Sequence, residues 1–459
     1  MIDIQREVIT ALGIAGIYLL VFFIGETVRR LIPSNTEISR KAVHLLGGLI
    51  AISFPYLFIS HWTVLALSVS FCAIVLITKN KGILKSVHDI ERKSYGSICY
   101  PAAIYLIFLL SSTKPVIYFI SILVMAVSDP IAALVGRKYG VIKFDVEGNL
   151  KSIEGSIAFF CVTFLCIHLP LLLLTNIGRT ESVLIALITA LLVTGFEAIS
   201  LSGSDNIIVP FTTYFILAKF IDQPLNVVVW QTELLLILIA TGIIMYIPLR
   251  LSKASGLIVM IILNYAALSM CSYYWFLPLF LAQILYYLLI LSFVHYEGKE
   301  KVASFQVKVL LYIGIIPAIF LFIASNHKDH IYVYLPYLTS ITAQLAIICN
   351  YYFANYISRP LPLKADNYLK HHGRVLEIVC SVATTLFIAG MPIYFYKTNH
   401  RLNSLIIVAV GTWVAYVLNF TVNNYYRSVK DNIFDYRWRF VSAAIGIACV
   451  FLLQEFISV

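Results

Sequence analysis

Charged residues are scarce in this sequence. They make up 12% of the 459 residues, whereas hydrophobic residues make up 60%. Because the mean hydropathy is +0.90, a soluble globular protein could not bury this much apolar surface. The apolar runs have the length of membrane helices rather than of barrel strands, and a helix satisfies its own backbone hydrogen bonds in lipid. The sequence therefore predicts an all-α, polytopic integral membrane protein.

Several other features are missing. The eight cysteines form no paired motif and most lie within apolar runs, which argues against a disulfide framework and against a zinc site. The sequence also contains no low-complexity segment and no internal repeat. The first apolar run, Ala11 to Gly25, is followed by no small-residue cleavage site. We therefore interpret it as a membrane span rather than as a removed signal peptide.

Apolar runs of helical length follow one another along the whole chain. We expect about 16 membrane spans, several of them short or re-entrant, such as 115–127 and 207–219. The candidate spans are 8–26, 42–60, 62–78, 97–112, 115–127, 155–175, 182–199, 207–219, 226–248, 255–271, 273–294, 308–324, 331–353, 374–391, 403–421 and 440–457.

Basic residues are distributed unevenly between the loops on the two sides of these spans. One set of loops contains 26 of the 33 Lys and Arg residues, and the opposite set contains the other 7. The first set is predicted to be cytoplasmic because cytoplasmic loops are enriched in Lys and Arg. The same bias accounts for the net charge of +10 without any binding to nucleic acid. The rich loops are 27–41, 79–96, 128–154, 200–206, 249–254, 295–308, 354–374 and 422–439.

Five polar blocks fall in or beside the loops predicted to be cytoplasmic, all in the first half of the chain. A site built from several loops at one membrane face can meet a soluble, charged substrate and a lipid headgroup together. The blocks read RKAVHLLGG from Arg40, ERKSYGSICYP from Glu91, SDPIAALVGRKYG from Ser128, KSIEGS from Lys151 and EAISLSGSDNIIVP from Glu197.

The third block places one carboxylate among cations and glycines. Ser128 has the character of a helix N-cap, and Pro130 is tolerated in a first helical turn. We therefore expect Asp129 at the start of a short helix, 131–135, that ends at Gly136. Basic residues then follow in a predicted loop of about fifteen residues. A carboxylate in such surroundings is suited to a metal–polyphosphate site.

The five blocks, in this order, resemble the polyprenol kinase family, which includes dolichol kinase, phytol kinase and the CTP-dependent diacylglycerol kinase. The resemblance covers about residues 40 to 220. It implies transfer of a phosphate from a nucleoside triphosphate, usually CTP, to the primary hydroxyl of a lipid alcohol at the cytoplasmic face, with a divalent metal. The candidate alcohols are a polyprenol or dolichol, phytol, farnesol and diacylglycerol.

Phosphoryl transfer needs charge neutralisation and positioning more than covalent chemistry. We predict that Asp129 and Asp205, together with Asn206, hold Mg²⁺, which prefers oxygen ligands. Glu197 is predicted to accept the alcohol proton or to hold the metal, and His44 to contact the alcohol or a phosphate. Residues predicted to bind the nucleotide phosphates are Arg40, Lys41, Gly136, Arg137, Lys138, Gly140, Lys151, Ser152 and Gly155.

Each of these residues also has a structural interpretation. The carboxylates could cap helices or turns, and the basic residues could serve only as positive-inside anchors. The glycines could simply end and restart helices, and His44 could be a buried polar residue near the entrance of a span. Ser152, before Glu154 and Gly155, also fits the N-cap of the next helix, whose N-terminus would attract an anion.

The leading hypothesis is a membrane kinase in residues 1–225, joined to a second multi-spanning helical domain of unknown role in residues 226–459. One alternative is an enzyme resembling cytidylyltransferases that forms a CDP-lipid at a similar Mg²⁺ site. Another is a transporter, although transporters place their coupling charges near the middle of the membrane. We expect a bacterial cell membrane, with the endoplasmic reticulum as the alternative. The sequence does not determine the oligomeric state.

Overall fold

The structure is a computed structural model. It contains two compact units, Met1–Ile237 and Leu238–Val459. The domain boundary predicted from the sequence, between residues 225 and 226, falls at the start of helix α11, Leu225–Leu249. The boundary between the two compact units falls within that helix, after Ile237. The residues that the structure describes are 4–31, 36–80, 96–146, 149–200, 203–249, 254–297, 307–326, 330–357, 382–383, 386–395, 401–427 and 436–457.

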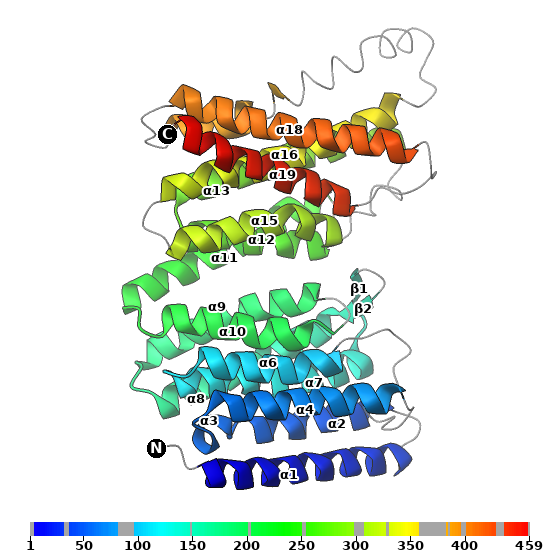
Figure 1. The fold of residues 1–459 in the computed structure, drawn as a ribbon, viewed down its shortest axis with the longest axis vertical. Helices are drawn as coiled ribbons and strands as arrows, with labels where there is room; N and C mark the ends of the chain where they lie inside the picture. Colours follow the sequence, from blue (N-terminus) through cyan, green and yellow to red (C-terminus); the bar gives the residue numbers. More distant parts are fainter. Residues whose placement is uncertain are drawn as a thin grey trace. The chain divides into compact units, whose positions relative to one another are not determined.

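The first unit is a bundle of helices with one small hairpin at its end (Figure 1). Most of its helices begin and end within a few residues of the predicted spans, because the apolar runs set their lengths. Its elements are α1 Ile4–Leu31, α2 Thr36–Ala51, α3 Phe54–Leu57, α4 His61–Asn80, α6 Gly96–Leu110, α7 Pro115–Tyr139, β1 Lys143–Val146, β2 Asn149–Ser152, α8 Ile153–Leu174, α9 Arg179–Ile199, α10 Asp205–Phe220 and the first part of α11 Leu225–Leu249, as far as Ile237.

Helix α7 is the centre of this unit, since it packs against α2, α6, α8 and α10. It runs without interruption from Pro115 to Tyr139, so the expected short helix at 131–135 is wrong. Ser128 is a buried helical residue whose Oγ accepts a 2.9 Å hydrogen bond from Thr163 in α8, and it is not an N-cap. Pro130 lies inside the helix, where it costs one backbone hydrogen bond. Asp129 is consequently held inside a packed helix, in its C-terminal half, rather than at a helix start.

The segment expected to be a loop after α7 contains an antiparallel hairpin of strands β1 and β2. Lys143 pairs with Ser152, and Phe144 pairs with Lys151. Successive residues of a strand point to opposite faces, and paired residues share a face. Lys151 therefore faces one side of the hairpin while Lys143 and Leu150 face the other.

The second unit is also helical, and α16 is its core. Residues 333–348 of α16 are buried throughout, and this helix packs against α13, α15, α18 and α19. Thr342 of α16 shares a 2.7 Å hydrogen bond with Thr412 of α18. The helices described in this unit include α12 Ala254–Met270, α13 Tyr273–Glu297, α15 Val307–Asn326, α16 His330–Ile357, Leu386–Phe395, α18 Arg401–Arg427 and α19 Tyr436–Ile457.

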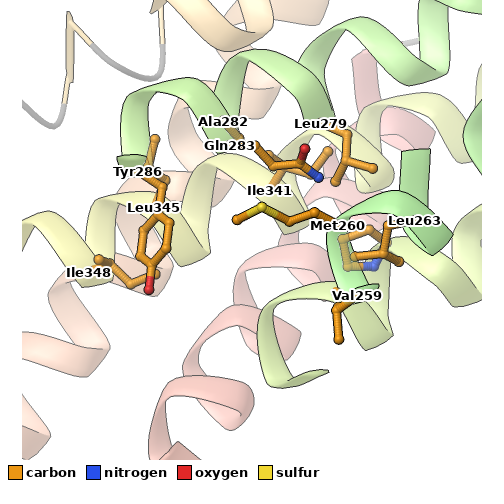
Figure 2. A pocket seen from close by; sticks show the side chains of 12 residues that line it. Val259, Met260, Leu263, Leu279, Ala282, Gln283, Tyr286, Ile341, Leu345 and Ile348 are labelled. Atoms are coloured by element: carbon orange, nitrogen blue, oxygen red, sulfur yellow. The ribbon is translucent and has the colours of Figure 1, made fainter. Parts of the chain in front are cut away.

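A small apolar pocket of about 50 Å³ lies between α12, α13, α15 and α16 (Figure 2). Met260, Tyr286 and Leu345 contribute to its wall. Gln283 is a polar residue of the wall, and its Oε1 accepts a 2.8 Å hydrogen bond from Asn264. A contact of this kind between polar side chains is typical of helix association within a membrane.

Among the described residues, eight helices are long and apolar enough to cross a membrane, and several shorter apolar helices accompany them. The prediction of an all-α, polytopic membrane protein is confirmed. Of the predicted spans within the described residues, two differ in detail, and the run at 374–391 lies mostly outside those residues. The run at 115–127 belongs to the 25-residue helix α7, and the run at 42–60 is divided between α2 and the short helix α3.

Candidate functional site

Helices α2 and α7 bring together three polar residues that are far apart in the sequence. The Nζ atom of Lys41 lies 2.6 Å from Oδ2 of Asp129, and Nε2 of His44 lies 3.7 Å from the same oxygen. The side chain of Lys41 is 6% exposed and that of Asp129 is 14% exposed. His44 also forms a 3.0 Å hydrogen bond through Nε2 with the carbonyl oxygen of Met125, one turn before Asp129. Lys41 and Asp129 therefore form a largely buried ion pair between α2 and α7.

The close approach of α2 and α7 depends on Gly48. A Cβ atom at this position would lie 2.3 Å from Cβ of Ala126 in α7 and 2.8 Å from the hydroxyl of Tyr100. The same hydroxyl donates a 2.9 Å hydrogen bond to the carbonyl oxygen of His44. Gly48 lies four residues after His44 and seven after Lys41, so all three share a face of α2. This glycine thus sets the separation across which Lys41 reaches Asp129.

Arg40 points to a different partner. Its guanidinium binds the carboxylate of Glu37 in the first turn of α2, with Nε 3.3 Å from Oε2. Arg137, at the end of α7, is exposed and lies within electrostatic range of Glu37. Our sequence reasoning missed Glu37, although its spacing of three residues from Arg40 was a usable signal.

A second ion pair joins strand β2 to helix α9. The Nζ atom of Lys151 lies 2.8 Å from Oε1 of Glu197 and 3.1 Å from the hydroxyl of Ser200, and it also donates to the carbonyl oxygen of Glu197. Three acceptors therefore surround one ammonium group. Ser200 belongs to the fifth polar block but was not predicted as a site residue, and it is the C-cap of α9.

Asp205 is the first residue of α10 and follows a tight turn. Gly203 in this turn has a φ of 86°, a left-handed conformation that favours glycine. The Oδ1 atom of Asp205 accepts a 3.1 Å hydrogen bond from the backbone of Asn206. The side-chain amide of Asn206 donates in turn to the carbonyl oxygen of Gly96, 3.0 Å away at the start of α6. The turn is thereby tied to the neighbouring helix.

These groups belong to one region at one end of the first unit. The charges of Asp129 and Asp205 both act on Arg40, and both also act on Glu197. Within the described part of the chain, no three His, Cys, Asp or Glu side chains form a group that could hold a metal ion by themselves. A metal at this site would thus need oxygen ligands from a substrate in addition to the protein carboxylates.

The three predicted phosphate-binding glycines share a packing role. A Cβ atom at Gly136 would lie 2.8 Å from Oγ of Ser152 and 3.3 Å from Cα of Gly155. At Gly140 it would lie 2.7 Å from Cβ of Ser152. Because these glycines have no Cβ atom, the end of α7 can lie in direct contact with the start of α8. Ser152 caps α8, since its Oγ accepts a 3.1 Å hydrogen bond from the backbone of Gly155, as the capping pattern predicts.

One residue predicted to bind phosphate lies at the exposed end of α7. Lys138 is exposed, with its ammonium 5.1 Å from the ring centroid of Tyr139. The block that begins at Glu91 lies outside the described residues as far as residue 95. Phosphate or metal binding by any of the predicted residues stays a prediction.

Replacing Lys151 with methionine is expected to destabilise the first unit by about 3 kcal/mol, because it leaves the largely buried Glu197 carboxylate without its cation. Glu197→Gln should cost less, since its amide oxygen and two other acceptors still bind Lys151. The exposed Lys138→Met is the matched control and should change stability by at most about 0.5 kcal/mol. Thermal unfolding in detergent measures all three, and equal shifts for the two lysine variants would contradict the pairing.

The fold and this cluster define a polytopic membrane protein with paired carboxylates and cations at one end of its first helical unit. The chain is 34% identical over 204 residues to a phytol kinase from Synechocystis, covering 87% of that protein and 44% of this chain. It is 32% identical over 231 residues to a probable chloroplastic phytol kinase from rice, Oryza sativa, covering 70% of it and 44% of this chain. A probable chloroplastic phytol kinase from Glycine max is 29% identical over 230 residues, covering 75% of it and 46% of this chain. No family model and no solved structure matches the chain.

The chain therefore belongs, through its first half, to the polyprenol kinase family, and it is a lipid-alcohol kinase. The resemblance inferred from the five blocks is confirmed. The comparisons favour the kinase over the cytidylyltransferase and the transporter. They cover less than half of this chain and give the second unit no function.

Proposed function

We propose that the first unit transfers the γ-phosphate of a nucleoside triphosphate, CTP in the first instance, to the primary hydroxyl of an isoprenoid alcohol at the cytoplasmic face. The observation that carries this proposal is the gathering of Asp129, Asp205 and Glu197 with Arg40 and Lys41 at one end of membrane helices. Phytol is the first alcohol to test, since the relatives bear the name phytol kinase. The concentration of Lys and Arg in the same loops supports the cytoplasmic face.

The donor groups present fit Mg²⁺. This ion commonly takes one or two protein carboxylates and completes its shell with substrate phosphates and water. Asp129 and Asp205 would hold it together with the side-chain oxygen of Asn206, whose amide nitrogen donates to the carbonyl oxygen of Gly96. Bound there, it would neutralise charge on the phosphates as the phosphoryl group is transferred.

The protein's own residues would position the two substrates. Lys41, which binds Asp129, and Arg40, in range of both aspartates, would stabilise the charge on the phosphate oxygens. The bond from the γ-phosphorus to the bridging oxygen breaks, and the bond to the alcohol oxygen forms. Glu197 would accept the alcohol proton, while Lys151 holds its carboxylate in place. His44 would orient Asp129 from the α2 side.

Phosphate transfer by the full-length protein in lipid nanodiscs tests this function. With Mg²⁺, γ-labelled CTP and phytol, farnesol, dolichol or diacylglycerol, we expect label in the lipid with an isoprenoid alcohol. A chelator of divalent ions should abolish the reaction. Asp205→Ala should lower the rate about a hundredfold, because half of the proposed metal-binding carboxylates is lost.

Two outcomes would contradict the proposal. CTP labelled in the base should leave no label in the lipid, whereas base label in the lipid would show formation of a CDP-lipid. Absence of lipid label with every pairing of CTP or ATP and alcohol would exclude the transfer itself. Full activity in Asp205→Ala would remove only the assignment of this residue to the metal.

A further inference from the structure

The small apolar pocket of the second unit is closed by two of its helices and open along the other two. Its wall residues from α15 and α16 are buried. The half-buried residues of the wall all belong to the remaining helices, namely Met260 and Leu263 in α12 and Ala282 and Gln283 in α13. Both of these helices are apolar. A lipid chain in the membrane would therefore enter the pocket on the side of α12 and α13.

Two amide side chains at this pocket have more hydrogen-bonding capacity than they use. The Nδ2 atom of Asn264 donates to Oε1 of Gln283, 2.8 Å away, and Gln283 lines the pocket beside Met260 (Figure 2). The Oδ1 atom of Asn264, a residue that is 8% exposed, has no hydrogen-bond partner among the described residues. Gln283 makes no second hydrogen bond within the same part of the chain, so its Nε2 donor is unused as well. One hydrogen bond between two primary amides leaves one donor and one acceptor, whichever way each amide is turned.

The surroundings make these unused groups costly. Asn264 and Gln283 lie well inside α12 and α13, away from the turn that joins the two helices. Within the hydrocarbon of a membrane no bulk water satisfies them, and an unsatisfied amide group there costs free energy. A hydroxyl group both donates and accepts, so one hydroxyl can bind Oδ1 of Asn264 and Nε2 of Gln283. The ester and phosphate oxygens of a phospholipid only accept, and they would leave Asn264 unpaired.

The size of the pocket limits which part of a ligand can enter. An apolar cavity of about 150 Å³ holds a benzene ring, so a pocket of about 50 Å³ holds about two or three heavy atoms. This is enough for a hydroxyl group and the first carbons of a chain, but not for a ring that carries a hydroxyl. The remaining chain would lie outside the pocket, against the apolar surface of α12 and α13.

We propose that this pocket binds the hydroxyl end of a long-chain primary alcohol. The hydroxyl lies between Asn264 and Gln283, and the first carbons contact Met260 and Leu345. The second unit thereby binds the same chemical class that the first unit is proposed to phosphorylate. That link between the units rests on the proposed function, whereas the site itself does not.

The test is photolabelling of the full-length protein in lipid nanodiscs. The probe is hexadecanol with a diazirine near its hydroxyl and an alkyne at the end of its chain, and mass spectrometry locates the labelled residues. We expect label at the open side of the pocket, on Met260, Leu263 or Ala282. Phytol should compete at about a tenfold lower fraction of the lipid than its methyl ether, because the ether cannot donate to Asn264.

A double variant makes the test specific to the two amides. Asn264→Leu combined with Gln283→Met removes the donor and the acceptor together, so it leaves no single amide unpaired and thermal unfolding should stay close to that of the native protein. Phytol and its methyl ether should then compete equally. Thr421→Val is the matched control, exposed on α18, and it should retain the tenfold difference.

Three results would overturn the proposal. They are absence of label at the pocket, equal competition by phytol and its methyl ether in the native protein, and a tenfold difference that persists in the double variant. Label in the first unit is read on different peptides and reports on the alcohol site of the proposed function. None of these measurements uses phosphate transfer, so the binding site and the proposed function can each fail without the other.

Discussion

Asp129→Asn is expected to lower the rate of phosphate transfer by about a hundredfold to a thousandfold. Asparagine has nearly the same shape, but it cannot supply the negative charge that a metal and the Lys41 ammonium require. The change also leaves Lys41, only 6% exposed, without its counter-charge, which would cost about 3 kcal/mol of stability or more. Initial rates with labelled nucleotide and thermal unfolding of the same preparation measure the two effects together.

A second variant separates catalysis from folding. Lys41→Met combined with Asp129→Asn removes both charges and retains an apolar side chain of similar length, so stability should return towards that of the native protein. Activity should remain low, because the proposed metal ligand and the phosphate-binding cation are both absent. If the double variant instead recovered native activity, the pair would be only a structural ion pair between α2 and α7. The proposed role of Asp129 would then be wrong.

The sequence predicted the helices of this protein better than the surroundings of its polar residues. Apolar runs define helix lengths directly, so α8 and α9 begin and end close to the predicted spans. The Ser-Asp-Pro sequence was misleading because its local preference is for a helix start. Packing of α7 against four other helices overrides that preference and keeps Pro130 inside one continuous helix.

The contacts of the site depend on tertiary packing and could not be read from the sequence. Lys41 and Asp129 are 88 residues apart, and Lys151 and Glu197 are 46 apart. The pattern could indicate that acidic and basic blocks share a membrane face, but not which lysine meets which carboxylate. It assigned Arg40 and Lys41 the same role, whereas α2 directs them to Glu37 and Asp129 respectively. One residue of difference along a helix is enough to point two side chains to different partners.

Gly48→Ala is expected to damage both stability and activity, although it adds a single methyl group. That methyl would lie 2.3 Å from Cβ of Ala126 and 3.2 Å from its Cα, so α2 and α7 would have to separate. Overpacking of this kind costs about 1–3 kcal/mol. A shift near 1 Å between Lys41 and Asp129 would lower the rate by up to about a hundredfold.

Gly16→Ala is the matched control for this effect, since nothing lies within 4 Å of the added Cβ and the residue is exposed on α1. Alanine is the better helix former, so this variant should be as stable as the native protein or up to about 1 kcal/mol more stable. Thermal unfolding and phosphate transfer, measured side by side, distinguish the two glycines. Equal behaviour would mean that the contact at Gly48 does not set the distance between α2 and α7. In that case the site would owe its geometry to the polar contacts of Tyr100, His44 and Asp129 rather than to the close approach of two backbones.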